Sequence, residues 1–439
     1  MSENNGPGFI DPSYGKEGLA AIPAPGLDPN VTTLQVSSAA CAPDGSMAFY
    51  GYNLGAERMP GWFTRLDADG QWDLATGHVP VSTGQTEPHP EYLYAFTSMI
   101  YAVVDGEASY ITASRVSYLD ASGTEHHQVA IGRYQAEDFK PAVEFGDDGI
   151  ALPEPFRSTR GDSMRRVQER EPKATDYRNT PKLGVIDGKI RVIFGGERRS
   201  TGSSKKHTWC ALLDAKTGKP EIGLGPEGKD SQYRLSLIDD ESTTLYHAEF
   251  LSEGGFLLLS SANGKIYLHR FLPNAMPDKG FASGQGYIVL SNGWTRAGMA
   301  VNDRYIVVSR GGSLNDPIGQ PNEVYCYTLS GEEDSTFRHS PSVKGHTLIL
   351  DHLSFDSQGR LVLAGQIYYL EQQWIKSKMQ VVRYLSNGEL DVDFGNKGYS
   401  PVNEYQVGSN GLYLDDQGIR VLTLMPNEPF YEQMVKLYS

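Results

Sequence analysis

Short apolar runs separated by glycine-containing or Asn-Asp turns recur along the whole chain. The turns are PDGS (43–46), VDGE (104–107), IDGK (186–189), SEGG (252–255), VNDR (301–304), DSQG (356–359) and DDQG (415–418). Each turn is followed by a run rich in β-branched and aromatic residues, such as SMAFYGY after the first turn and KIRVIFGG after the third. The glycine, asparagine and aspartate residues of the turns supply the positive φ angles that tight hairpins need. The pattern therefore predicts an all-β chain built from repeated antiparallel hairpins.

Two further markers repeat in the same order after each hairpin. The first is a third apolar run, as in GWFTRL (61–66) and MQVVRYL (379–385). The second is a motif with an aromatic residue and glycines, present as DPSYGKEG (11–18), DLATG (73–77), AVEFGDDG (142–149), EIGLGPEG (221–228), DKGFASGQG (278–286), DSTFRHS (334–340) and DVDFGNKG (391–398). We interpret each unit as a four-stranded meander with strands A to D, the motif lying in strand D. Seven such sheets bury their faces by packing around an axis, which predicts a seven-bladed β-propeller.

The two ends of the chain complement each other. The last unit ends at its third apolar run, EQMVKLY (432–438), whereas the first motif has no preceding run. We therefore predict that residues 8–18 supply strand D of the C-terminal blade and close the ring. The whole chain, 1–439, is then expected to be a single propeller domain with a long loop insertion at 153–182.

The last complete unit resembles a known repeat. The segment VVRYLSNGELDVDFGNKG (381–398) is similar to the delta-60 repeat of bacterial β-propellers, in which an Arg-Tyr pair precedes a glycine turn, an aspartate and a Phe-Gly motif. Other units depart from it, since Thr76 and Leu224 replace the aromatic residue and Arg338 replaces the glycine. The resemblance implies a propeller from a mostly Gram-negative bacterial family, and it implies no catalytic residues.

Composition and charge narrow the classes of function. The net charge of −15 argues against a nucleic-acid or anionic-membrane binder. The three cysteines, Cys41, Cys210 and Cys326, are far apart and form no CxxC motif, which argues against a disulfide framework or a cysteine zinc site. No apolar run is long enough to span a membrane, and no secretory signal is visible. We expect a cytoplasmic protein, and export by a route without a cleaved signal stays open.

One acidic stretch suggests a metal site. In DADGQWD (67–73), Asp67, Asp69 and Asp73 alternate like the ligands of a calcium loop. The same slot holds SNGELD (386–391) in the last complete unit, so an ordinary turn between strands C and D is the favoured interpretation. No cofactor is expected.

Basic residues concentrate in two segments of the third unit. The segments 157–182 and 198–206 each carry a net charge of +4, in loops that the meander places on one face of the disc. The candidate partner-binding residues are Arg160, Arg165, Arg166, Arg198, Arg199, Lys205 and Lys206. They are suited to a phosphate, a carboxylate or an acidic protein surface. The alternative is that both segments are simply solvated loops.

Three hypotheses of function follow, and they belong to different classes. The leading one is a monomeric, non-enzymatic scaffold that engages a protein, glycan or anionic ligand through the face with the long loops. The alternative is a bacterial hydrolase or lyase, or a secreted effector or toxin component, with a site in the central funnel of that face. A lectin is the third, although no Trp or Asp recurs between strands B and C. Converging ionisable side chains near the axis are expected of an enzyme, and an exposed apolar patch of a partner-binding protein.

Overall fold

The computed structural model describes most of the chain. The described residues are 6–22, 33–54, 61–77, 79–80, 95–119, 125–153, 180–200, 203–238, 243–292, 296–311, 322–337, 340–343, 346–371, 374–401, 407–416, 418–424 and 432–439. Within them no helix is long and apolar enough to cross a membrane.

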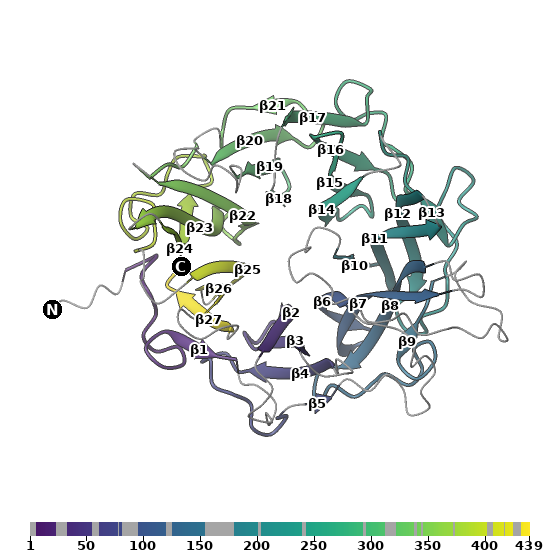
Figure 1. The fold of residues 1–439 in the computed structure, drawn as a ribbon, viewed down its shortest axis with the longest axis horizontal. Coiled ribbons are helices and arrows are strands. Elements are labelled where there is room, and N and C mark those ends of the chain that lie inside the picture. Colours follow the sequence, from purple (N-terminus) through teal and green to yellow (C-terminus); the bar gives the residue numbers. More distant parts are fainter. Residues whose placement is uncertain are drawn as a thin grey trace.

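Seven blades surround a common axis (Figure 1). The strands of each blade are given from the innermost outward. Blade 1 contains β2 (Thr33–Cys41), β3 (Met47–Leu54), β4 (Gly61–Leu66) and β5 (Val79–Pro80), and blade 2 contains β6 (Ala95–Val104), β7 (Glu107–Leu119), β8 (Glu125–Gln135) and β9 (Ile150–Ala151). Blade 3 contains β10 (Lys182–Ile186), β11 (Lys189–Ser200), β12 (Ser203–Asp214) and β13 (Gln232–Arg234). Blade 4 contains β14 (Thr244–Phe250), β15 (Phe256–Ala262), β16 (Lys265–Phe271) and β17 (Tyr287–Asn292), blade 5 contains β18 (Ala297–Val301), β19 (Tyr305–Arg310), β20 (Glu323–Thr328) and β21 (Glu333–Asp334), and blade 6 contains β22 (Thr347–Phe355), β23 (Leu361–Glu371) and β24 (Trp374–Tyr384). Blade 7 contains β25 (Val407–Asp415), β26 (Gly418–Leu424), β27 (Glu432–Leu437) and, from the N-terminus, β1 (Leu19–Ala21).

The N-terminal segment closes the ring, as the sequence predicts. Strand β1 pairs antiparallel with β27, with Leu19 opposite Val435 and Ala21 opposite Gln433. The Gly8 amide also donates a hydrogen bond to the Tyr438 carbonyl at 2.9 Å. Strand D of blade 7 therefore comes from the start of the chain and strands A to C from its end.

In blades 1 to 4 and in blade 7 the repeated motif precedes strand D, which corrects the sequence-based assignment. In blade 2 the motif at 142–149 forms a turn, and strand β9 begins only at Ile150. Gly146 and Gly149 have φ angles of 60° and 90°, which an extended strand does not accommodate. In blade 7 the motif at 11–18 likewise precedes β1.

The motif fastens five of the blades to their neighbours. The residue that follows the aromatic position donates its backbone N–H to a carbonyl in the turn between strands C and D of the neighbouring blade. These hydrogen bonds are Gly15 to Asp69, Gly146 to Thr217, Gly225 to Asn274, Ala282 to Ser330 and Gly395 to Pro7. The last of these reaches the N-terminal segment, so the closing blade is held in the same way as the others.

A second repeated contact explains the basic residue at the end of strand C. In blade 6 the Arg383 Nε donates to Asp391 Oδ2 at 2.7 Å, and the guanidinium lies over the Phe394 ring at 4.5 Å. In blade 1 the Arg65 Nε donates to Asp73 Oδ2 at 2.8 Å, and its Nη1 donates to the Ala136 carbonyl of blade 2 at 2.8 Å. The aspartate of the motif and the arginine of strand C are therefore a structural pair.

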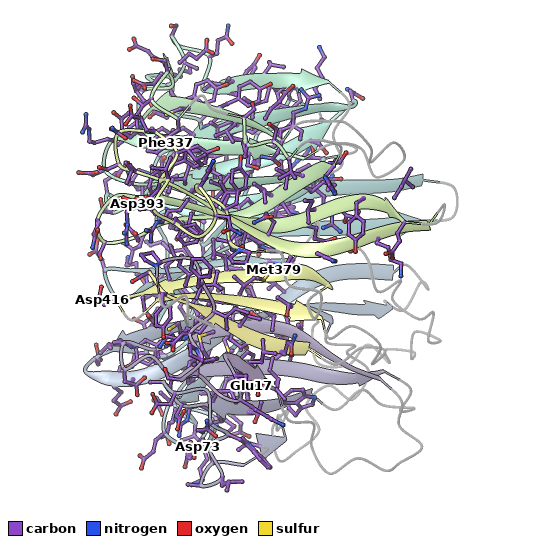
Figure 2. The ribbon with its side chains drawn as sticks, turned by 90° about the vertical axis from the view of Figure 1, so that its left-hand side faces the viewer. Glu17, Asp73, Phe337, Met379, Asp393 and Asp416 are labelled. Atoms are coloured by element: carbon purple, nitrogen blue, oxygen red, sulfur yellow. The ribbon has the colours of Figure 1, made fainter. Side chains whose placement is uncertain are left out.

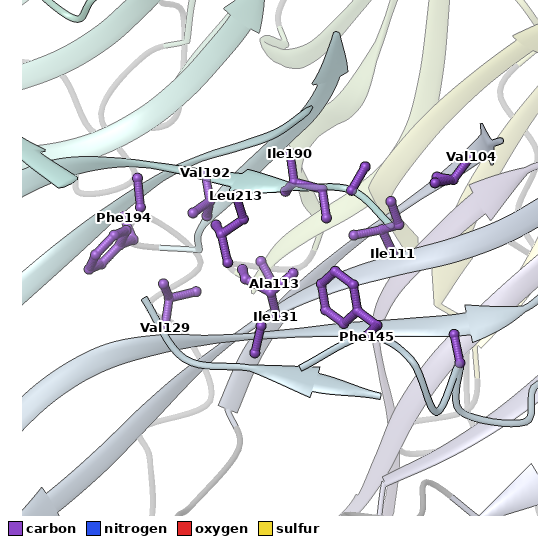
Figure 3. Close-up of a cluster of buried hydrophobic side chains, with 14 residues drawn as sticks. Val104, Ile111, Ala113, Val129, Ile131, Phe145, Ile190, Val192, Phe194 and Leu213 are labelled. Atoms are coloured by element: carbon purple, nitrogen blue, oxygen red, sulfur yellow. The ribbon is translucent and has the colours of Figure 1, made fainter. Parts of the chain in front are cut away.

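Apolar side chains fill the spaces between blades. Between blades 2 and 3 the cluster combines Ile111 and Ile131 with Ile190, Val192 and Leu213, all fully buried (Figure 3). Burying one such side chain stabilises the fold by about 1.5–3 kcal/mol. Alternate residues of the middle strands face opposite neighbours, so each blade buries both of its faces.

The two faces of the disc differ. Asp73, Asp393 and Asp416 lie toward one face, which carries the turns between strands A and B and between strands C and D (Figure 2). We call it the turn face. Strands β11 and β12, of 12 residues each, run from the turn face toward the opposite face, where β11 ends at Ser200 and β12 begins at Ser203.

Candidate functional site

The structure places four of the seven basic candidates on two paired strands. Arg198 and Arg199 belong to β11, Lys205 and Lys206 belong to β12, and Arg198 is the cross-strand partner of Lys205. The sequence-based assignment of 198–206 to a loop is therefore wrong, because the ladder continues through Ser200 and Ser203. Arg160, Arg165 and Arg166 lie outside the described residues.

Blades 2 and 3 are joined at the end of the β11–β12 hairpin that carries Arg198 and Lys205. The outer edge of β8 pairs with the free side of β11, with His126 opposite Arg198 and Glu125 opposite Arg199. Strand β10 leaves that side of β11 open because its own pairing with β11 reaches only to Ile193. His126, Arg198 and Lys205 therefore occupy opposed backbone positions on three adjacent strands. Like charges placed directly opposite each other destabilise a sheet, so hairpin stability does not explain this arrangement.

Two of the aspartates considered as calcium ligands, Asp67 and Asp73, make hydrogen bonds to other groups of the protein. Asp67 Oδ1 accepts the backbone N–H groups of Asp69 and Gln71 at 3.0 and 2.8 Å. Burial opposes ionisation of Asp73, but its hydrogen bonds from Thr76 and Arg65 outweigh it and lower the pKa of Asp73 to about 2. Among the residues that the structure describes, no three His, Cys, Asp or Glu side chains are grouped to hold a metal ion.

A second group of ionisable residues, which the sequence interpretation missed, lies on the innermost strands. The pairing of β14 with β15 skips Tyr246, and the pairing of β22 with β23 skips Asp351. Each skipped residue is a β-bulge followed by a histidine, within the segments LYHAEF (245–250) and LDHLSF (350–355). Bulges re-aim side chains and occur often beside functional sites.

In blade 4 the bulge is followed by a histidine–glutamate pair. His247 Nε2 lies 2.7 Å from Glu249 Oε1, and the two side chains are 31% and 39% exposed. Lys182, at the start of the innermost strand of blade 3, interacts electrostatically with Glu249. Burial lowers the pKa of Lys182 to about 8, and the nearby Glu249 carboxylate opposes that shift only in part.

In blade 6 the equivalent histidine lies beside an aspartate–arginine pair. Arg296 Nη1 donates to Asp351 Oδ2 at 3.3 Å, and His352 Nε2 lies 3.8 Å from Asp351 Oδ1. The bulge allows this proximity, because consecutive residues of a regular strand point to opposite faces. Burial raises the pKa of Tyr368 on β23. The positive charge of Arg296 opposes this shift, and the negative charge of Asp351 adds to it.

A buried polar network holds the blade 6 bulge in place. The Asn322 carboxamide, fully buried, accepts the Leu350 N–H at 2.9 Å and donates to Ser309 Oγ at 3.2 Å. The Ser309 hydroxyl in turn donates to the Leu350 carbonyl. A Cβ at Gly298 would overlap the Asp351 carbonyl, so this glycine allows β18 and β22 to approach closely. Asp351 is therefore positioned by blade 5 as well as by its own strand.

A third histidine shows what a structural histidine looks like in this fold. His269 is 4% exposed, its Nε2 lies 3.1 Å from Ser260 Oγ, and burial lowers its pKa to about 4. His247 and His352 differ from it, since each is about a third exposed and has a carboxylate beside it.

Comparisons with known proteins show architecture alone. No protein-family model and no curated protein matches the chain. Among solved structures, a polysaccharide lyase, Uly1, is 10% identical with a TM-score of 0.48, covering 97% of this chain and 93% of its own. Sqt1 of Chaetomium thermophilum, bound to the N-terminus of ribosomal protein L10, is 10% identical with a TM-score of 0.42, covering 94% and 98%. An α-L-arabinofuranosidase of Fusarium graminearum is 9% identical with a TM-score of 0.43, covering 96% and 97%.

At these identities and TM-scores, what the neighbours bind or cleave does not transfer to this chain. The fold rests on its own strand pairing. The chain is a seven-bladed β-propeller whose N-terminal strand closes the ring.

Proposed function

We propose that the propeller is a binding module that engages an acidic protein through the end of the disc opposite the turn face. The observation that carries this proposal is the register of the strands joining blades 2 and 3, in which Arg198 lies between His126 and Lys205. Arg199 and Lys206 extend the same basic segment. On a chain with a net charge of −15, a local concentration of cations attracts an acidic partner and orients its approach.

The arrangement is suited to recognition because the basic residues are on strands. Strands of a propeller are rigid, so less conformational entropy is lost on binding than for residues on a free loop. The delta-60-like repeat is compatible with the same proposal, since that resemblance implies a propeller and no catalytic residues.

The test uses immobilised poly-L-glutamate as the acidic probe. We expect the wild-type protein to be retained at low salt and released as salt screens the charges. The variant Arg198→Glu/Arg199→Glu should be retained less and should show a flatter salt dependence. Thermal unfolding of the variant should match the wild type, so that a loss of retention reports on binding and not on folding.

A matched control reverses two charges elsewhere. Lys219 and Lys279 are exposed residues in the turns between strands C and D on the turn face, and Lys219→Glu/Lys279→Glu changes the net charge by the same amount. Equal retention of the two double variants would show that net charge alone governs binding, and the proposal would be wrong. Retention on heparin without retention on poly-L-glutamate would mean that the ligand is an anionic glycan and not an acidic protein.

A further inference from the structure

We propose that the outer edge of β12, over Ser203–Lys206, binds an extended acidic segment of a partner protein as an additional strand. The main chain of that segment pairs with β12, and its acidic side chains meet the basic residues of the β11–β12 hairpin. The inference rests on the proposed function, because it names the form of the acidic partner and the way in which the hairpin binds it.

The first observation is that β13 covers only part of the outer edge of β12. Strand β13 is the outermost strand of blade 3 (Figure 1), and it pairs with β12 from Trp209 to Ala211. The Leu235 N–H adds one hydrogen bond, to the Thr208 carbonyl at 2.9 Å, and the described residues 236–238 belong to no strand. Within the described part of the chain, β12 therefore continues past β13 over Ser203–Lys206, a length of about 14 Å.

The second observation is the direction of the main-chain groups along this edge. In an antiparallel sheet, successive residues direct their N–H and C=O groups to opposite sides of the strand. Thr208 and Leu212 direct theirs outward, since the Thr208 carbonyl accepts from Leu235 and the Leu212 N–H donates to the Ser231 carbonyl at 2.8 Å. The pairing of β12 with β11 has no register shift from Ser203 to Asp214. Ser204 and Lys206 follow the same alternation, so their main-chain groups also face outward.

The third observation is that the same hairpin already binds a strand from another blade on its inner edge. The pairing of β10 with β11 ends at Ile193, and further along β11 the strand β8 of blade 2 pairs with Arg198 and Arg199. The residue of β8 opposite Arg199 is Glu125, an acidic residue. Strand addition beside the basic residues is therefore compatible with the geometry of this hairpin, and the outer edge of β12 is its counterpart on the other side.

Charge decides which kind of strand fits this edge. Opposite charges on neighbouring strands stabilise a sheet, and like charges destabilise it. Lys205 and Lys206 lie in the edge strand itself, and Arg198 and Arg199 lie in the strand next to it. A second copy of this chain pairing edge to edge would place lysines beside lysines, and edge lysines commonly protect proteins from such self-association. An extended segment rich in aspartate or glutamate is the occupant that these charges favour.

The probe is a synthetic eight-residue peptide of alternating glutamate and threonine, which is acidic and suited to an extended conformation. Its binding to the full chain is measured by titration calorimetry at low salt, and hydrogen–deuterium exchange is followed at the Ser204 and Lys206 amides. We expect the peptide to bind, and we expect both amides to exchange about tenfold or more slowly in the complex than in the free protein, because each becomes hydrogen-bonded.

A methylated peptide separates main-chain pairing from charge. It has the same sequence and the same net charge, but its four central amide nitrogens carry methyl groups and cannot donate hydrogen bonds. We expect it to bind about tenfold or more weakly than the unmethylated peptide. This comparison uses the wild-type protein, so its outcome does not depend on whether a variant folds.

A matched pair of variants at Ser204 tests whether this edge is the one that is used. Ser204→Pro removes an outward N–H from β12 without changing the net charge, and proline is tolerated where the N–H of an edge strand faces away from the sheet. We expect it to weaken binding of the unmethylated peptide by about fivefold or more. Ser204→Ala keeps the N–H and should bind as the wild type does. Thermal unfolding of both variants checks that they are folded.

Three results would overturn the inference. They are equal binding of the two peptides, equal binding by the two folded Ser204 variants, or Ser204 and Lys206 amides that exchange as slowly in the free protein as in the complex. A wild-type dimer that Ser204→Pro dissociates would assign the edge to a second copy of the chain, and it would overturn the inference as well.

The edge and the proposed function fail in different ways. Retention on poly-L-glutamate that depends on Arg198 and Arg199, together with equal binding of the two peptides, would mean that the hairpin binds acidic proteins through its charges without adding a strand. Absence of retention on poly-L-glutamate, together with tighter binding of the unmethylated peptide, would mean that the edge pairs with a strand and that the charges do not select an acidic protein.

Discussion

The Lys436 ammonium lies 3.3 Å from the Asp11 carboxylate, and this ion pair joins the last strand of the chain to its first turn. It has the same place in blade 7 as the Arg383–Asp391 pair, at 2.7 Å, has in blade 6. Both aspartates are more than nine-tenths buried. The ring is therefore closed by the repeated contact that stabilises an ordinary blade, made between residues from opposite ends of the sequence.

Removing residues 1–21 should destroy the closure. The deletion removes β1, Asp11 and the Pro7 carbonyl that accepts the Gly395 N–H, and it exposes the edge of β27. We expect loss of cooperative thermal unfolding and aggregation, because an unpaired strand edge is a template for association. Unfolding followed by circular dichroism, with light scattering, measures both.

Deletion of residues 1–5 is the matched control, since it leaves every one of these contacts in place. It should unfold as the full chain does. A protein lacking residues 1–21 that melts as sharply and at the same temperature as the control would contradict the closure.

Gly395→Ala should destabilise the protein more than Gly228→Ala. Both glycines have positive φ, 52° and 64°, so each substitution pays a conformational cost of about 1 kcal/mol. At Gly395 the added Cβ also overlaps the Tyr399 carbonyl and disturbs the N–H that bonds to Pro7, whereas Gly228 has open space around it. We expect a further loss of about 1–3 kcal/mol at Gly395, measured by urea unfolding. Equal losses would mean that the turn is not a fastening point.

Asp391→Ala should be strongly destabilising because it leaves a buried charge uncompensated. The Arg383 side chain is 3% exposed, and Asp391 is its carboxylate partner. Breaking a buried pair of this kind costs about 3–5 kcal/mol. The exposed neighbour Asp393 serves as control, and Asp393→Ala should change stability by about 0.5 kcal/mol or less. The double variant Arg383→Met/Asp391→Leu should recover part of the loss, and a double variant as unstable as Asp391→Ala would contradict the explanation.

Stability should fall on acidification because of His269. Burial lowers the pKa of His269 from 6.5 to about 4, so the folded protein keeps it neutral while the unfolded chain takes up a proton below 6.5. This contribution is complete above pH 6.5 and is lost as the pH falls from 6.5 toward 4. The slope is at most about 1.4 kcal/mol per pH unit.

Urea midpoints at about pH 7 and pH 5 measure this effect, with His269→Asn as the comparison because asparagine cannot titrate there. The variant is expected to be less stable at neutral pH and to lose less stability on acidification. If both proteins lose the same amount, the acid sensitivity originates elsewhere.

The sequence by itself determined the seven units, their antiparallel strands and the contribution of the N-terminus to the last blade. These features follow from local chemistry: β-branched and aromatic runs extend, glycine turns reverse the chain, and the order of three markers leaves one strand missing at the C-terminal end. The basic residues of 198–206 were also identified from the sequence, although their conformation was not.

Only the tertiary structure decided how the units meet. The motif at 391–398 forms a turn because Gly395 bonds to Pro7, a residue nearly four hundred positions away. Arg198 is opposite His126 because β10 is too short to cover the end of β11. The bulges ahead of His247 and His352, and the place of β18 between β14 and β22 (Figure 1), likewise depend on how neighbouring strands pair and pack. Register between strands of different blades depends on packing across the whole ring, and local sequence does not encode it.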